Sequence, residues 1–427
     1  MKRVARIGRN LVVDVRPLRK SRDLRCLFGG QLVIMLGGQL TTVAVPYQVY
    51  SLTRSSLDVG LVSLAQLLPL IAGGVVGGAL ADAVDRRSLL LASQLLTALC
   101  AAGLAVNATV GTALWPLFVL PAAAAGCAVA GESGLSAMLP NLAGRSETAT
   151  VNAMFQALLQ VGQVAGPAVA GLLLAGVGVR FVYWLDAASV AVAMLATARM
   201  GRQRPAGTSH SPGLRSIVDG LRHLRGQPLI QGAFLIDINA TVFGVPSAVF
   251  PALAFGVFHG GARTLGLLYA APGAGALLGA VTTGWVHRVR RQGRAVILAV
   301  IIWGAAIACF GLSHWLALAL ALLAVAGWAD VVSAVFRGTI IQLAAPDALR
   351  GRLMGLQMAV VTAGPRIGDA ESGAAASAFG ATASVVSGGL ACIGGALILA
   401  RLLPAFSRQE TSTAGEAELA RAVGAGS

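Results

Sequence analysis

Eight ionisable side chains stand inside long apolar stretches of the chain: Glu132, Asp186, Asp237, Asp330, Arg337, Arg366, Asp369 and Glu371. An ionisable residue in such surroundings is costly, which makes each of them a functional candidate. A carboxylate there can alternate between a protonated and a charged form as water reaches it from one side or the other. The chemistry that these residues predict is proton uptake and release coupled to a conformational change.

Asp237 is the first proton-coupling candidate. It lies about eight residues into the apolar stretch 229–253, which is roughly 12 Å along a helix at 1.5 Å per residue. Glu132 is the second candidate, because no oppositely charged residue lies within its own stretch. For both residues the alternative is a structural hydrogen bond or ion pair between helices.

Two further sets of charges are spaced for pairing within one helix. Asp330 and Arg337 are seven residues apart and share a face, and Arg366 and Asp369 are three apart and can pair directly. We favour structural pairing for both sets, with Asp330 and Asp369 as the next proton-coupling candidates. Asp186 lies near one end of its stretch and is also expected to be structural.

Uncharged polar residues form stripes on two apolar helices. Gln156, Gln160 and Gln163 follow a helical spacing in one stretch, and Gln39 and Thr42 do so in another. Such stripes should face each other or a wet cavity rather than lipid. These five residues, with Asn239, are candidates for lining a substrate site, and hydrogen bonding between helices is the alternative.

Twelve long apolar stretches must position these residues, at 26–50, 57–81, 88–108, 112–136, 149–175, 181–200, 229–253, 264–286, 295–312, 315–340, 353–374 and 381–403. The 427 residues are 56% hydrophobic and only 11% charged, whereas soluble domains carry about 25% charged residues. A helix of about twenty residues crosses a bilayer core, and strands of membrane barrels are only about ten residues long. The sequence therefore predicts an all-α membrane protein with twelve transmembrane helices.

The basic residues are distributed asymmetrically. With the N-terminus in the cytoplasm, 27 of the 32 Lys and Arg residues fall inside, three fall outside and two lie within spans. The positive-inside rule then predicts a multi-pass protein of the inner (cytoplasmic) cell membrane with both termini in the cytoplasm. The net charge of +15 is explained by topology, so we expect no nucleic-acid partner.

The longest connection lies halfway along the chain, and five segments follow from it. These are a basic cytoplasmic arm (1–25), a six-helix bundle (26–200), a cytoplasmic central loop with an amphipathic helix (201–228), a second six-helix bundle (229–403) and a cytoplasmic tail (404–427). The two bundles share a weak repeat with an offset of 206 residues, which aligns Gly60, Gly73 and Gly78 with Gly266, Gly279 and Gly284. Parallel repeats of this kind are used by secondary transporters.

The turn between the second and third spans reads GALADAVDRR. It resembles the loop signature of the major facilitator superfamily at Gly78, Asp82, Arg86 and Arg87, and departs from it at Ala83 and Asp85. The resemblance covers essentially the whole chain and implies two six-helix halves that rock around a central site. It also implies that this loop is a gating latch, which forms charge-assisted bonds in one conformation and releases them in the other. The alternative is a loop that only sets topology.

A second motif, GQVAGPAVAG, begins at Gly162. It resembles the fifth-helix motif of the drug:proton antiporter branch at Gly162, Gly166, Pro167 and Gly171, where glycines suit close helix packing and proline suits a kink. The fourth-helix arginine of many such antiporters is absent. FPALA, GLLYAA and LRGRLMGLQ resemble the enterobactin-exporter branch.

The resemblance implies a secondary active transporter that exports a small molecule, such as a siderophore, a macrolide or another drug-like compound, by proton antiport with alternating access. An importer or facilitator of the same fold is the alternative, and a non-transporting membrane scaffold is less favoured. No nucleotide-binding motif, metal-ligand spacing or loop of catalytic size is present, so we expect no enzyme activity, cofactor or metal. The expected partners are the substrate, protons and the lipid bilayer, and the protein is expected to be monomeric.

The charge asymmetry gives a test of topology. A reporter fused after Arg225 should report the cytoplasm, and one fused near His259 should report the outside, because basic loops are retained inside. Alkaline phosphatase and fluorescent-protein fusions would measure this. The opposite labelling would contradict both the orientation and the assignment of the latch.

Overall fold

The computed structural model describes residues 21–143, 147–203, 227–345 and 347–407, and within these ranges the chain forms helices and turns without a β-strand. The predicted amphipathic helix of the central loop and most of the two predicted terminal segments lie outside the described residues. The first group of helices comprises α3 (Arg22–Thr53), α4 (Ser56–Ala65), α5 (Leu67–Ala83), α6 (Arg86–Val110), α7 (Trp115–Ala143) and α8 (Thr148–Ala198).

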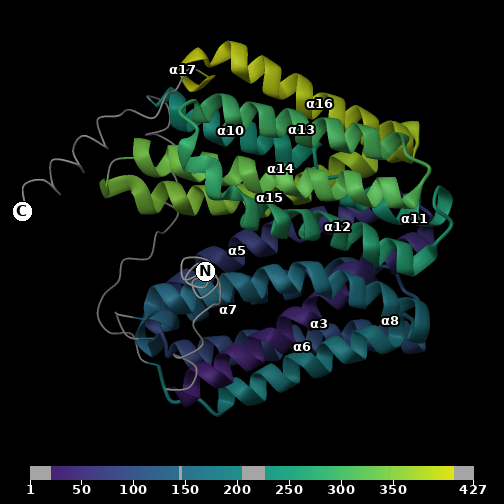
Figure 1. Ribbon diagram of the computed structural model, residues 1–427. Coiled ribbons are helices and arrows are strands. Elements are labelled where there is room, and N and C mark those ends of the chain that lie inside the picture. Colours follow the sequence, from purple (N-terminus) through teal and green to yellow (C-terminus); the bar gives the residue numbers. More distant parts are fainter. Residues whose placement is uncertain (1–20, 144–146, 204–226, 346, 408–427) are drawn as a thin grey trace, which may run out of the picture.

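The second group follows the central loop. It comprises α10 (Pro228–Phe243), η1 (Ser247–Val249), α11 (Phe250–Gly256), α12 (Gly261–Thr282), η2 (Thr283–Arg288), α13 (Gln292–Leu312), α14 (Leu316–Ala344), α15 (Asp347–Phe379), α16 (Ala381–Leu402) and α17 (Pro404–Ser407). Figure 1 shows the two groups as two layers of long helices that run side by side.

The spans agree with an all-helical membrane fold. Ten helical stretches of the described residues are long and apolar enough to cross a membrane. One of them, α8, contains two predicted spans that meet at Gly178, whose φ of 82° turns the chain without a separate loop. The predicted span 353–374 lies in α15, which is 33 residues long but more polar. The predicted fold class is thus confirmed, and the helices are consistent with twelve crossings.

Two predicted spans are interrupted. The second span is divided at Gln66 into α4 and α5, and the seventh is divided at Gly244 into α10 and the η1–α11 segment. Backbone groups freed by a break in a membrane helix must find partners inside the protein. The indole of Trp303 donates to the Gly244 carbonyl at 2.9 Å, and the Gln66 side-chain amide donates to the Val62 carbonyl at 3.3 Å.

Helix pairing follows the same order in both groups. In the first group α3 packs against α8, α5 against α7, and α6 against α7 and α8. In the second group α10 packs against α15 and α16, α12 against α14, and α13 against α14 and α16. Two related halves would produce this matched arrangement.

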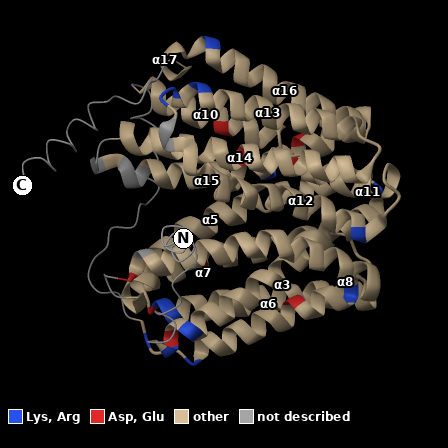
Figure 2. Ribbon diagram, viewed as in Figure 1, with Lys and Arg blue, Asp and Glu red and all other residues tan. Residues whose placement is uncertain are grey.

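We refer to the two ends of the molecule by their turns. The α5–α6 end carries the turn between these helices, the start of α3 and α17, and the α11 end lies opposite, at the right of Figure 1. Figure 2 shows basic residues at both ends of the helices, with a cluster of them beside the α5–α6 turn.

The two groups meet along two tight seams. In the α8–α12 seam, a Cβ on Gly171 would lie 2.7 Å from the Gly266 Cα. In the α4–α15 seam, a Cβ on Gly60 would lie 2.3 Å from the carbonyl oxygen of Asp369. Real Cβ atoms do not approach backbone this closely, so glycine is required at these positions. Both contacts lie toward the α11 end, where Phe255 of α11 also stacks on Tyr50 of α3.

The α8–α12 seam should be sensitive to side-chain size. Gly171→Leu should lower the melting temperature of the purified protein in detergent, because the backbones must separate and overpacking costs about 2 kcal/mol. Gly176→Leu is the matched control, since among the described residues no atom beyond the glycine's own stretch of helix lies within 4 Å of a Cβ at Gly176. Equal melting temperatures for the two variants would contradict the tight seam.

Candidate functional site

A cavity of about 900 Å³ lies mainly within the first group of helices. Side chains of α3, α4, α6, α7 and α8 form most of its wall, and the second group adds Ser247, Tyr269, Arg366 and Asp369. The breaks in spans 2 and 7 place Gln66 and Ser247 in this wall. The cavity is large enough for a drug-sized ligand and is lined by many hydroxyl and amide groups.

Some of the predicted polar residues line this cavity. Thr42 on α3 and Gln156 on α8 are part of its wall. Gln163 lies at the α8–α12 seam instead, where its backbone carbonyl oxygen is 2.9 Å from a Cβ built on Gly273. The polar stripe on α8 therefore starts at the cavity and runs on to the contact with the second group.

Three other predicted lining residues are not part of the cavity wall. The side chain of Gln39 packs on Gly166 of α8. The Gln160 amide oxygen is buried and has no hydrogen-bond partner among the described residues. Asn239 on α10 donates to the Cys392 carbonyl at 2.9 Å and so joins α10 to α16.

Two carboxylates of the cavity wall lie within the first group. Asp186 accepts hydrogen bonds from Thr41 at 2.5 Å and from Ser189 at 3.5 Å, and thereby ties the second half of α8 to α3. Glu132 on α7 also lines the cavity. In the described part of the chain the structure gives its carboxylate no hydrogen-bond or ion-pair partner.

Asp369 lies where the second group closes the cavity. Its carboxylate accepts from the Ser247 hydroxyl and from the Ala248 backbone N–H, the latter at 3.0 Å. The Ser63 hydroxyl on α4 also bonds to it, across the seam between the groups. Asp369 therefore connects α15, η1 and α4, and Arg366 lines the cavity one turn away.

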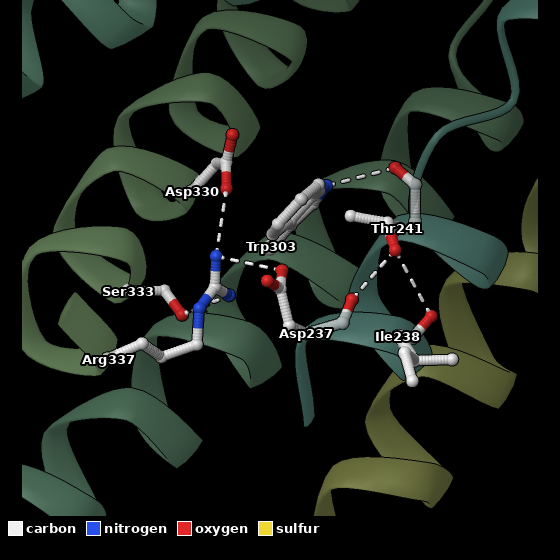
Figure 3. A network of polar contacts seen from close by, with 8 residues as sticks. Asp237, Ile238, Thr241, Trp303, Asp330, Ser333 and Arg337 are labelled. Carbon is white, nitrogen blue, oxygen red and sulfur yellow. Dashed lines mark hydrogen bonds and ion pairs between the residues drawn. The ribbon is translucent and has the colours of Figure 1, made fainter. Parts of the chain in front are cut away.

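A second cluster of charges lies inside the second group, away from the cavity wall (Figure 3). Arg337 on α14 forms an ion pair with Asp237 on α10 at 2.9 Å and lies 3.9 Å from Asp330. It also donates to the Ser333 hydroxyl at 2.9 Å. Asp237 and Arg337 are 1% and 2% exposed, whereas Asp330 is 44% exposed. We call Asp237, Asp330 and Arg337 the charge triad.

Residue spacing within one helix could predict a contact between Asp330 and Arg337, but not the ion pair that Arg337 forms with another helix. Asp330 and Arg337 share a face, as expected, but the nearer partner of Arg337 comes from another helix. Only tertiary packing brings α10 and α14 together, so the sequence held no signal for the Asp237–Arg337 pair. Gln94, which lines the cavity, was missed although it is also a polar residue inside an apolar span.

The loop signature is built into the end of the first group. Gly78 and Asp82 lie in the last turns of α5. Asp85 is the N-cap of α6, where its carboxylate accepts from the backbone N–H of Arg87 at 3.0 Å and of Gln203 at 3.1 Å. An aspartate at this position satisfies N–H groups that a helix start leaves free.

Both arginines of the signature bind carbonyls of other helices. Arg86 donates to the Ala137 carbonyl, within α7, at 2.8 Å. Arg87 donates to the Thr197 and Ala198 carbonyls at the end of α8, at 3.2 and 2.5 Å. Carbonyls at a helix C-terminus carry partial negative charge, so those of α8 suit a guanidinium group. The loop thus joins α5 and α6 to α7 and α8.

The fifth-helix motif contacts both groups. Gly162 and Gly166 face α3, whereas the Pro167 carbonyl and Gly171 face Gly266 on α12. The motif therefore packs within its own group and also against the other. Among the described residues no three His, Cys, Asp or Glu side chains are grouped to hold a metal ion.

Two groups of helices with matched pairing, joined by glycine seams beside a large cavity, define a membrane transporter of the major facilitator class. The family model described as "Transmembrane secretion effector" matches residues 14–423, and the chain belongs to this family of the major facilitator superfamily. It is therefore an integral multi-pass membrane protein that transports a small molecule, and not an enzyme.

The chain is similar to curated transporters of comparable length. It is 31% identical to the enterobactin exporter EntS of Citrobacter koseri over 385 residues, which is 90% of this chain and 92% of that protein. The same identity and coverage hold for EntS of Shigella boydii serotype 18.

Solved structures support the fold. A mutant of the nucleoside transporter NupG aligns with a TM-score of 0.74 and 13% identity, over 90% of this chain and 100% of that one. A bacterial homologue of the iron transporter ferroportin in an inward-facing state aligns with a TM-score of 0.65 and 16% identity, over 91% and 99% of the two chains.

The buried ion pair should be important for stability. Asp237→Asn should lower the free energy of unfolding by about 3 kcal/mol, because it leaves a buried guanidinium without its nearest counter-charge. Asp330→Asn should have a much smaller effect, since the 2.9 Å pair remains. Thermal unfolding in detergent would measure both, and equal losses would contradict the central role of the Asp237–Arg337 pair.

Proposed function

We propose that the protein exports a bulky small molecule from the cytoplasm by alternating access, driven by proton antiport. The observation that carries this proposal is the large cavity, lined by both polar and apolar side chains, beside seams that are closed at the α11 end. Relatives named enterobactin exporters support a siderophore or a compound of similar bulk as the substrate. An importer or facilitator of the same fold is the second candidate.

The position of the cavity supports loading from the cytoplasm. Its wall includes Leu90 near the start of α6, Leu139 near the end of α7 and Asn152 near the start of α8. All three lie toward the α5–α6 end, which the charge asymmetry assigns to the cytoplasm. Substrate would enter from this end and leave after the seams at the α11 end open.

The loop signature would then act as the gating latch. Its arginines bind carbonyls of α7 and of the end of α8, so the α5–α6 turn and these helices would move together as one body. Asp82 would form and break contacts at the cytoplasmic end as the two groups rock. Bonds between charged groups are strong yet reversible enough for this role.

The charge triad would carry the proton. Two carboxylates share one guanidinium, so one added proton would make the cluster neutral. Asp330 has the most exposed side chain of the three, whereas Asp237 and Arg337 are buried, so we assign the exchange of the proton to Asp330. When Asp330 loses its proton it would compete with Asp237 for Arg337, which changes the contact between α10 and α14. Glu132 and Asp369 remain the other proton-coupling candidates.

Transport in inside-out vesicles tests the proposal. With an acidic lumen, the protein should concentrate enterobactin or a macrolide, and Asp330→Asn should abolish this pH-driven accumulation while the protein stays folded. Glu371→Gln is the comparison, because it removes a carboxylate that lies outside both the triad and the cavity wall, and it should keep the pH dependence. Accumulation without an acidic lumen would contradict antiport, and pH-driven accumulation by Asp330→Asn would exclude the triad.

A further inference from the structure

Asp237, the buried acid of the charge triad, lies on a short helix. α10 has 16 residues and ends at Phe243, and the next helical turn of the same span begins only at Ser247. A continuous membrane helix would hold Asp237 through its own backbone on both sides. Because the span is interrupted, the position of Asp237 depends on the contacts that hold the two ends of α10.

The end of α10 is held by Trp303 of α13. Its indole N–H donates to the Gly244 carbonyl oxygen at 2.9 Å (Figure 3), and its side chain is only 5% exposed. A Cβ on Gly244 would lie 3.1 Å from the indole nitrogen, so the ring packs directly on the end of the helix. A buried hydrogen bond therefore attaches the interrupted end of α10 to α13.

The start of α10 is held by Phe406 of α17. Phe406 is 1% exposed, and a Cβ on Gly232 of α10 would lie 2.6 Å from its ring. A Cβ on Gly293, at the start of α13, would overlap the backbone carbonyl of Phe406. Real Cβ atoms do not approach other atoms this closely, so glycine is required at both positions. The two glycines thus leave a space between the starts of α10 and α13 that Phe406 fills.

Both attachments lead to α13, and Asp237 lies between them. It follows Gly232 by 237 − 232 = 5 residues and precedes Gly244 by 244 − 237 = 7 residues, which is about 7.5 and 10.5 Å along a helix at 1.5 Å per residue. Its partner Arg337 belongs to α14. α13 and α17 therefore set the height of the carboxylate in the bundle, whereas α14 sets the height of the guanidinium.

The ion pair is sensitive to these heights. The attraction between two charges falls with their separation and is strongest where water is excluded, and Asp237 and Arg337 are both almost fully buried. A shift of α10 would lengthen their 2.9 Å contact. Asp330 lies on the same helix as Arg337 and would not move with α10, so the guanidinium would be left to Asp330.

We propose that Trp303 and Phe406 are positioning residues for proton coupling, and that they clamp α10 at both ends so that Asp237 meets Arg337. The inference rests on the proposed role of the charge triad in proton antiport. Neither residue belongs to the triad, and both act through the backbone of α10. Loss of either contact should leave substrate movement possible but separate it from proton movement.

Double-mutant cycles on the purified full-length protein in detergent test the clamp without a gradient. Asp237→Asn should lower the melting temperature, and this loss should fall to about half or less in the Trp303→Phe and Phe406→Leu backgrounds, because the ion pair is already weakened there and residues that act independently give additive losses. Trp303→Phe keeps an aromatic ring without the N–H donor, and Phe406→Leu keeps an apolar side chain, so both variants should fold.

Two control variants remove the same groups from other contacts. Trp328 of α14 also donates its indole N–H, to the Thr282 hydroxyl of α12 at 3.0 Å. Phe310 of α13 is also 1% exposed, but it packs on Phe250 of α11. Asp237→Asn should cost its full loss in the Trp328→Phe and Phe310→Leu backgrounds. Additive losses in either clamp background, or equal reductions in the controls, would overturn the proposal.

Transport by the reconstituted protein separates positioning from a general loss of fold. Trp303→Phe and Phe406→Leu should reduce pH-driven accumulation of enterobactin or a macrolide about fivefold or more, while exchange of the same probe without a gradient stays within about twofold of the wild type. A residue with only a structural role would lower both activities equally, so equal losses would also contradict the clamp.

The same measurements distinguish this proposal from the proposed function. Failure of the wild-type protein to accumulate either probe under a pH gradient would contradict proton antiport. The melting temperatures would then still decide whether Trp303 and Phe406 hold Asp237 at Arg337, because they are measured without a gradient or a substrate.

Discussion

Polar groups inside a membrane protein must be satisfied by the protein itself, and the architecture of this transporter depends on that constraint. Lipid offers no hydrogen bonds to backbone or side chains. The interrupted span 7 is possible because Trp303 of α13 binds the freed carbonyl of Gly244. A buried arginine is tolerated at position 337 of α14 because the carboxylate of Asp237 on α10 lies 2.9 Å from its guanidinium group. The irregular and charged positions are therefore also the positions where helices are joined.

The same constraint separates two kinds of polar site. In the second group Asp237 and Arg337 pair with each other and are almost fully buried. In the first group the polar side chains surround a cavity, and at Glu132 and Gln94 the matching is incomplete within the described part of the chain. Polar groups that lack a partner within the protein can be met by water or by a ligand. This contrast underlies our proposal that the second group couples protons and the first group binds substrate.

Much of the fold could be predicted from the sequence, because span length and hydropathy follow directly from bilayer thickness. Gly178 shows a limit of this approach: its turn merges two spans into α8 and leaves no polar loop between them. The candidate site was harder to predict. Glu132 and Thr42 line the cavity, but Gln39 packs on glycine and Asn239 bonds to α16. Which face of a nearly uniformly apolar helix meets the cavity depends on tertiary packing, and periodicity does not encode it.

The Asp237–Arg337 pair also has a consequence for biogenesis. The two residues are 337 − 237 = 100 positions apart, so α10 leaves the ribosome well before α14. Each charge alone costs about 3 kcal/mol at the centre of an inserting helix. Until α14 arrives, α10 has to keep its aspartate near water, in the protein channel or at the membrane surface. The second group would therefore complete its membrane insertion late and cooperatively. Full insertion of α10 would require α14, because α14 carries the arginine that pairs with Asp237.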